Sequence, residues 1–154
     1  MTTLRLAWIE HGSADYAAEV ALRDEVLRKP LGLSFTPEQL AAESDSRHLL
    51  AWDGDALVGC LLLTPRGNGI IQMRQVAVSP TRQGGGVGRA LVVEAERRAA
   101  ELGCTRMMLH ARDTAVAFYL RLGYHAGGEP FVEVGIPHRE MEKELHPGPA
   151  PNPA

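Results

Sequence analysis

The sequence contains little cysteine: Cys60 and Cys104 are the only two among its 154 residues. Cys60 lies in an apolar segment typical of a strand, Cys104 directly precedes another, and neither has neighbours at metal-ligand spacing. The fold is therefore expected to depend on neither disulfides nor a metal ion. Two reduced thiols favour a cytoplasmic protein.

Long apolar runs and an excess of basic charge are also missing. No run approaches the length that spans a bilayer, and the N-terminus lacks a basic region followed by an apolar stretch. The formal net charge of −3 provides no broad basic surface. We therefore expect neither a membrane nor a nucleic acid as partner. The 45% of hydrophobic residues is enough for one ordinary domain with its own core.

The most informative segment runs from Gln72 to Gly103 and predicts a strand, a glycine-rich loop and a helix in succession. Met73–Val78 is apolar and rich in β-branched residues, and Ser79-Pro80 ends the strand. The helix begins inside a run of glycines, at Val87. Unpaired N–H groups at a helix start, next to glycines, can bind a phosphate. A simple glycine-rich turn is the alternative, because isolated glycine motifs are weak signals.

Two widespread phosphate-binding motifs are absent from this segment. The chain has no Gly-Lys followed by Ser or Thr, which excludes a P-loop. Gly86-x-Gly88 leads to Leu91 instead of a third glycine, so a dinucleotide fingerprint fits poorly.

Upstream of this segment, alternating apolar residues predict a strand over residues 4–9. Residues 48–53 and 56–65 flank Gly54-Asp55 and predict a hairpin. A helix that Ser13 or Asp15 caps follows the first strand, and a second runs from Thr36, with a capping box to Gln39, as far as about Ser44. Arg23 lies on the apolar face of the first helix. Its head is either solvated or reaches into a substrate cleft.

Downstream, residues 106–110 predict a strand, and Val116–Leu122 a helix that Asp113 or Thr114 caps. From Tyr124 onward the pattern predicts two closing strands, with irregular breaks at residues 127–130. The order predicts a mixed α/β domain over residues 1–145, a central sheet of six to seven strands with helices on both faces. The proline-rich residues 146–154 predict a disordered tail.

Three motifs resemble those of one family. The run Gln83-x-x-Gly86-x-Gly88 resembles the acetyl-CoA signature of the GNAT N-acetyltransferase superfamily, Arg/Gln-x-x-Gly-x-Gly/Ala. Ala115-x-x-Phe118-Tyr119-x-x-x-Gly-Tyr resembles that superfamily's Ala-x-x-Phe-Tyr-x-x-x-Gly-Phe segment. Residues 135–138 (GIPH), with a Met-x-Lys following, resemble the C-terminal signature of ElaA-like members. The predicted order of elements is also that of the GNAT acyltransferase fold.

The resemblance implies acetyl-CoA as cofactor and a set of residues that hold it. The pantetheine arm would pair with the backbone of Val76, Ala77 and Val78 as a substitute strand. The pyrophosphate would be bound by backbone amides of Gln83, Gly84, Gly85, Gly86, Val87, Gly88 and Arg89, and the second motif would add Ala115, Phe118 and Tyr119. Relatives splay two strands here, which leaves backbone N–H groups for the oxyanion, an effect of about 3 kcal/mol.

By the same resemblance, Tyr119 would be the general acid that protonates the leaving thiolate. The alternative is a structural tyrosine whose ring packs in the core. Some relatives carry a glutamate base at the position of Gln72, which cannot take up a proton usefully. Gln72 and Arg23 would then contact the substrate. Glu133 and His138 are the candidate bases, each with a structural role as its alternative.

The function predicted is transfer of the acetyl group from acetyl-CoA to a primary amine by direct attack in a ternary complex, without a covalent enzyme intermediate. A small-molecule amine is the first choice, because a short acidic chain has no added docking module. A protein lysine or N-terminus, or a non-catalytic CoA-binding module, are the alternatives. A homodimer is compatible with the resemblance, since many relatives pair through their C-terminal strands.

Overall fold

The computed structural model describes residues 4–146, so the predicted tail from residue 147 onward lies outside the described residues. The chain divides into two compact units. The first contains Met1–Thr64 and Met73–Ala95, and the second contains Pro65–Gln72 and Glu96–Ala154. The two units are described separately below.

The strands of the first unit are β1 (Arg5–Ile9), β2 (Arg47–Asp53), β3 (Ala56–Gly67) up to Thr64, and β4 (Ile70–Val78) from Met73. β1 pairs with β2, and β2 pairs with β3, both antiparallel. The middle of β2 and β3 is fully buried, which explains their nearly continuous apolar sequence. The predicted hairpin around Gly54-Asp55 is confirmed.

Three helices accompany these strands. α1 (Ala14–Arg23) continues into a π-helical turn, Asp24–Arg28, and a short 3-10 turn; α2 spans Pro37–Ala41 and α3 spans Val87–Glu101. The Ser13 side chain caps α1 by accepting a hydrogen bond from the Tyr16 amide, so the alternative cap at Asp15 is wrong. The predicted capping box between Thr36 and Gln39 is present, but α2 ends before the predicted Ser44.

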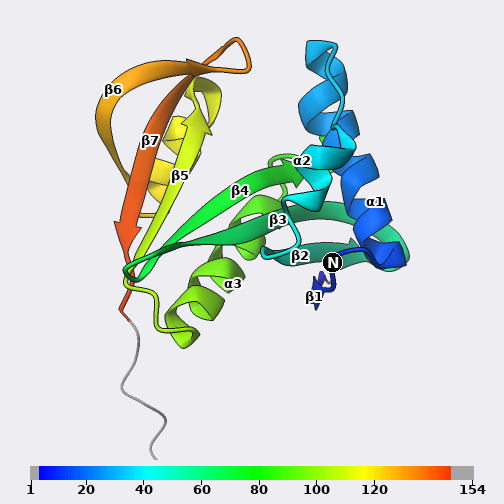
Figure 1. Ribbon diagram of the computed structural model, residues 1–154, viewed down its shortest axis with the longest axis horizontal. Helices are drawn as coiled ribbons and strands as arrows, with labels where there is room; N and C mark the ends of the chain where they lie inside the picture. The colour runs from blue at the N-terminus through cyan, green and yellow to red at the C-terminus, as the bar shows by residue number, and fades with distance from the viewer. Residues whose placement is uncertain (1–3, 147–154) are drawn as a thin grey trace, which may run out of the picture. The chain divides into compact units, whose positions relative to one another are not determined.

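Helices cover both faces of the strands in the first unit (Figure 1). Cys60 of β3 packs with Leu22 of α1 in one apolar cluster. A Cβ added to the preceding residue, Gly59, would lie 2.8 Å from Cγ1 of Val87 and 2.9 Å from Cδ1 of Leu91, both in α3. Because successive residues of a strand face opposite sides, α1 and α3 lie on opposite faces of β3.

The second unit contains β5 (Arg106–Arg112), β6 (His125–Glu133) and β7 (Ile136–Glu144), with β7 paired antiparallel to both of the others. The predicted irregularity is confirmed as a register shift between Gly127 and Phe131. One face of these strands supplies buried core residues: Met107, Leu109, Ala111 and Met141.

The start of α4 (Val116–Arg121) differs from the sequence-based prediction. No side chain caps it, so the predicted caps Asp113 and Thr114 are wrong. A 3-10 turn over Asp113–Ala115 precedes the helix instead, and its backbone closes through a hydrogen bond from the Val116 amide to the Asp113 carbonyl. A 3-10 turn satisfies a helix-start donor without a side chain.

Seven strands and the interspersed helices of residues 4–146 confirm the predicted mixed α/β class and strand number. Within that range, no helix is long and apolar enough to cross a membrane.

Candidate active site

The end of β4 and the glycine loop are held together by hydrogen bonds within the first unit. The Gln83 side chain donates to the Val78 carbonyl over 3.1 Å, and the Ser79 amide donates to the Val58 carbonyl of β3 over 2.8 Å. Arg82 forms an ion pair with Asp53. Since these contacts join the first residues of the loop to the three strands β2, β3 and β4, the loop starts from a fixed position.

The glycines of the loop leave its backbone open to solvent. Gly84 has a φ of +83° and Gly86 a φ of +91°, in the left-handed region that other residues avoid. A Cβ added at either glycine would meet nothing within 4 Å. The three glycines at 84–86 are exposed, so a ligand can approach the main chain there directly.

α3 begins immediately behind these glycines. The first amide with an intrahelical acceptor here is that of Ala90, which donates to the Gly86 carbonyl over 3.0 Å. The amides of Val87, Gly88 and Arg89 therefore have no acceptor inside the helix. The Val87 side chain is buried and fixes the helix start, whereas Gly88 and Arg89 are more accessible. Such a helix start favours an anionic phosphate.

Gln75 in β4 is a feature that the sequence analysis missed. Its φ is +54°, although the residues on either side belong to the same β-strand. Its side-chain Oε1 is buried and has no hydrogen-bond partner in the described part of the chain. A non-glycine residue in this conformation costs about 1–3 kcal/mol and often marks a functional site. The distortion comes directly before Val76–Val78, whose backbone is predicted to bind the pantetheine arm. The polar pair Arg74-Gln75 inside the strand was its sign in the sequence.

Gln72 lies in the second unit and is 6% exposed. Its amide oxygen accepts hydrogen bonds from both Nε and Nη2 of Arg66, the former over 2.7 Å. The acceptor atom of this side chain is thus already engaged. A contact between Gln72 and substrate stays a prediction.

Tyr119 and Tyr124 are adjacent buried tyrosines that differ in one respect. The Tyr124 hydroxyl donates to Glu96 over 2.8 Å, and Glu96 also accepts from Nζ of Lys143 over 2.9 Å. The Tyr119 hydroxyl forms no hydrogen bond among residues 4–146, although the side chain is only 6% exposed. Burial raises the pKa of Tyr119, so its phenol stays protonated at neutral pH. It is therefore available as a proton donor.

Two other residues of the second motif, Phe118 and Ala115, lie close to Tyr119 in the chain. Phe118 packs edge-on against the Tyr119 ring with centroids 5.0 Å apart, and Ala115 is the residue from which α4 begins.

Glu133 and His138, the candidate bases, lie close together in the second unit. The His138 Nε2 lies 3.7 Å from Glu133 Oε2, and His110 Nδ1 lies 3.2 Å from Glu133 Oε1. The His138 side chain is 4% exposed and that of Glu133 is 48% exposed. The two candidate bases thus lie in a single cluster, which also includes His110.

Arg23 lies in a buried polar network of the first unit. Its guanidinium is 0% exposed and donates to Glu19 over 2.7 Å and to both oxygens of Glu43 over 2.8 and 2.5 Å. A solvated head is therefore excluded, while a contact with substrate stays a prediction. Burial alone would lower the pKa of Arg23, but the hydrogen bonds and charge of Glu43 outweigh it and raise this pKa.

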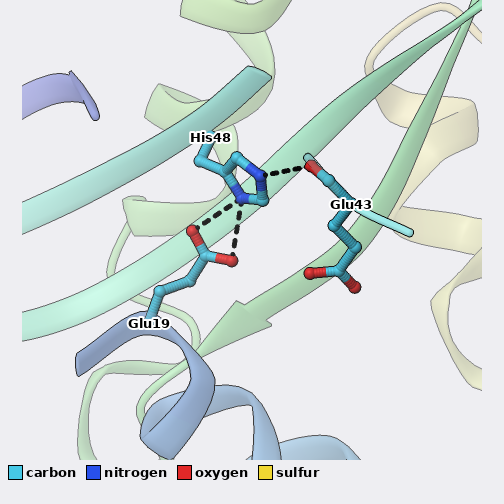
Figure 2. Close-up of side chains that lie close together, drawn as sticks. All are labelled: Glu19, Glu43 and His48. Carbon is cyan, nitrogen blue, oxygen red and sulfur yellow. Dashed lines mark hydrogen bonds and ion pairs between the residues drawn. The ribbon is translucent and has the colours of Figure 1, made fainter. Parts of the chain in front are cut away.

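His48 joins the same network from β2 (Figure 2). Its Nδ1 lies 3.0 Å from both oxygens of Glu19, and its Nε2 lies 3.1 Å from the Glu43 carbonyl oxygen. Both ring nitrogens thus face acceptors, which favours the doubly protonated imidazolium. Burial lowers the pKa of His48, but the Glu19 carboxylate outweighs burial and the pKa is raised.

Glu19, Glu43 and His48 have ligand atoms within 4.8 Å of one another, close enough to hold a metal ion. However, the Arg23 guanidinium already hydrogen bonds both carboxylates and supplies the positive charge at that point. These contacts identify the group as a structural ion network.

Comparison with known proteins identifies the class. Residues 21–145 match the family described as "Acetyltransferase (GNAT) domain". The chain is 30% identical over 124 residues to the Bacillus subtilis protein called uncharacterized N-acetyltransferase YjcF, covering 80% of this chain and 88% of the relative. The chain therefore belongs to the GNAT family of acetyltransferases.

Solved structures agree with this membership. An acyl-CoA N-acyltransferase from Pseudomonas aeruginosa is 27% identical, with a TM-score of 0.79 and coverage of 92% of this chain and 99% of the other. Escherichia coli ElaA shares the fold at 22% identity, a TM-score of 0.78 and coverage of 92% and 100%. A Bacillus subtilis acetyltransferase in complex with CoA shares it at 18% identity, a TM-score of 0.73 and coverage of 94% and 100%.

The protein is thus an acetyl-CoA-dependent acyltransferase with acetyl-CoA as cosubstrate. The residues of this chain fit that group: the open backbone at Gly84 and Gly86 and the unpaired amides that begin α3 suit a pyrophosphate. Which residues contact the cosubstrate stays a prediction.

Replacing Gly86 with alanine should weaken acetyl-CoA binding about tenfold or more. Alanine at a φ of +91° is strained by about 1–2 kcal/mol, so the loop would relax and misplace the amides behind it. Gly12→Ala is a matched control, because Gly12 has a φ of +83° and is equally exposed, with nothing within 4 Å. Calorimetric titration should show full affinity for Gly12→Ala. Equal affinities in the two variants would contradict a cofactor role for the loop.

Proposed function

We propose that the protein acetylates a primary amine of a small molecule by direct attack on acetyl-CoA within a ternary complex. The observation that carries the proposal is the open glycine backbone followed by unpaired amides at the start of α3. Acetyl-CoA supplies the acetyl group as an activated thioester. Amides of Gln83–Arg89 would hold the pyrophosphate, and the backbone of Val76–Val78 would hold the pantetheine arm.

The Gln75 distortion supports the same site. A residue with a φ of +54° turns the backbone out of the regular ladder, which can free an N–H group beside the reacting carbonyl. A backbone donor at the developing oxyanion is worth about 3 kcal/mol. The strain would thus be retained for its effect on the reaction.

Proton transfer would be assigned to the second unit. The Tyr119 hydroxyl, protonated and not hydrogen bonded within residues 4–146, would donate its proton to the leaving sulfur. Glu133 and His138 would accept the proton that the amine loses. Since Gln72 is engaged by Arg66 and cannot act as a base, this function has to come from elsewhere.

The two cysteines bear on the cellular location of the protein. Neither Cys60 nor Cys104 forms a disulfide, which supports a cytoplasmic location. We also propose a homodimer, by likeness to family members that pair through their C-terminal strands, and light scattering of the purified protein would test it.

Thermal unfolding with acetyl-CoA is the first test, with NAD and ATP as controls. At one hundred times its Kd a ligand that binds only the folded protein adds about 2.7 kcal/mol, which raises the midpoint by roughly 5–10 °C. We expect this shift with acetyl-CoA alone. No shift would contradict the cofactor site.

The acceptor is tested by thiol release from acetyl-CoA with an alkylamine, a polyamine and a lysine-containing peptide. We expect turnover with a small amine and little with the peptide. Turnover with the peptide alone would identify a protein acetyltransferase instead. Binding without turnover of any amine would indicate a non-catalytic CoA-binding module.

A further inference from the structure

His110, Glu133 and His138 lie on one face of the three strands of the second unit. His138 of β7 is the register partner of Arg112 in β5 and of Phe131 in β6, and Glu133 is the partner of Ile136. Residues two apart in a strand share a face, and so do direct partners. His110 therefore shares the face of Arg112, His138 and Glu133, opposite the buried Met141 face.

Glu133 is placed between the two imidazoles. One of its carboxylate oxygens lies 3.2 Å from His110 Nδ1, and the other lies 3.7 Å from His138 Nε2. The Phe131 ring contacts both histidines, edge-on to His110 at 5.0 Å and stacked on His138 at 5.8 Å between centroids. Each carboxylate oxygen of Glu133 thus faces a different histidine, and both histidines pack against the Phe131 ring.

The hydrogen bonding of His138 fixes its tautomer. Its Nδ1 lies 2.7 Å from the Ile136 carbonyl oxygen, which only accepts, so Nδ1 carries the hydrogen. The lone pair of the neutral ring is then on Nε2, the atom that faces Glu133. Because the side chain is only 4% exposed, this nitrogen has little water to compete with a substrate.

His110 differs from His138 in exposure and therefore in what it can do. Its side chain is 32% exposed, and its Nδ1 can donate to Glu133 without a competing carbonyl. An exposed ion pair such as His110–Glu133 adds only about 0–1 kcal/mol to the free energy of unfolding. The main effect of this pair is therefore to orient the Glu133 carboxylate toward His138.

We infer that His110 is a positioning residue that orients Glu133 toward His138, and that His138 Nε2 accepts the proton of the attacking amine. The inference rests on the proposed acetyl transfer. The amine nitrogen forms a bond to the acetyl carbon, the carbon–sulfur bond breaks, and the sulfur takes a proton. The proton from the amine goes to His138 Nε2, and the Glu133 carboxylate stabilises the resulting imidazolium.

A matched pair on the same hairpin provides the control. His125 of β6 lies 3.3 Å from Glu142 of β7, its direct register partner, with side chains 63% and 38% exposed. This pair has the same chemistry and a similar distance, but Glu142 faces no buried histidine. His125→Val therefore removes an equivalent contact without affecting His138.

The experiment compares three variants, His110→Val, His110→Asn and His125→Val. Asparagine has an amide nitrogen near the position of Nδ1 and can still donate to Glu133, whereas valine suits a strand and cannot donate. We expect His110→Val to lower kcat/KM for the amine about tenfold, with Kd for acetyl-CoA unchanged. His110→Asn should recover most of the activity, and His125→Val should retain all of it.

The imidazole resonances of His138 give a second readout that needs no turnover. Moving the Glu133 carboxylate away from His138 Nε2 changes the surroundings of that nitrogen, so its chemical shift should change. NMR spectra recorded at one pH should show this change in His110→Val and in Glu133→Gln, and none in His125→Val. Arg112 of β5 and Glu140 of β7 share this face and are kept in every variant, so their charges cancel in the comparison.

Failure of the inference and of the proposed function are distinguishable. If the wild type acetylates amines while His110→Val keeps its kcat/KM and pH profile, the inference is wrong and the function stands. If the wild type acetylates no amine, the proposed function is wrong. Unchanged His138 resonances in both His110→Val and Glu133→Gln would also overturn the inference, whatever the activity.

Discussion

Replacing Glu43 with alanine should lower the free energy of unfolding by about 3–5 kcal/mol, the largest effect on stability that we expect from one substitution. Arg23 is 0% exposed, and its guanidinium donates two hydrogen bonds to the Glu43 carboxylate. Without Glu43 the guanidinium keeps only Glu19 as a charged partner. The Tyr16 hydroxyl also loses the nearer of its two acceptors, at 2.8 Å, and keeps only the Leu40 carbonyl at 3.4 Å. Denaturant titration measures the difference directly.

Two comparison variants make this result specific. Asp45→Ala removes an exposed carboxylate two residues further along and should change stability by no more than about 0.5 kcal/mol. Adding Arg23→Met to Glu43→Ala should recover part of the loss, because the uncompensated buried charge is then gone. A loss below about 1 kcal/mol for Glu43→Ala would show that the network contributes little to the folded state.

Tyr119→Phe should reduce kcat by about 10² or more while leaving the Kd for acetyl-CoA nearly unchanged. A hydroxyl that acts only in the transition state affects turnover and not ground-state binding. The substitution removes a single oxygen that forms no hydrogen bond within residues 4–146, so stability should hardly change. Steady-state kinetics and acetyl-CoA titration of the same preparation provide both numbers.

Tyr124→Phe is the control for this experiment. It removes the same atom from a neighbouring tyrosine whose ring lies 5.6 Å from that of Tyr119. Its hydroxyl is bound to Glu96, so stability should fall by about 1–3 kcal/mol while kcat stays within a few-fold of the wild type. An unchanged kcat in Tyr119→Phe would remove this tyrosine from the mechanism.

Much of the fold could be predicted because its signals are local. Apolar runs on either side of Gly54-Asp55 indicated β2 and β3, and the Thr36 capping box and the glycine run marked two helix starts. The boundary of α2 was wrong because nothing local distinguishes a helix from the turns that follow it at residues 42–46. The start of α4 was wrong because backbone geometry, not a side chain, satisfies its donors.

The site was predictable only where the motif itself is contiguous. The glycine loop and Tyr119 each occupy one short segment, so their spacing indicated them. Glu43 and His48 meet Glu19 and Arg23 across some twenty to thirty residues of chain, and no periodicity relates them. Likewise, His110 joins Glu133 only because β5 and β6 both pair with β7. Contacts of this kind follow from strand register, which the sequence alone left open.

The missing side chain at Gly59 has a consequence for mutational tolerance. A methyl group there would come within 3 Å of Val87 and Leu91, and the Ala77 carbonyl lies 3.3 Å away, so the helix would have to move. Val87 is the residue at which α3 begins. A substitution at this buried glycine would therefore shift the start of α3 and the amides of its first residues. Laboratory evolution of this enzyme for new acyl donors is constrained at a buried glycine of β3.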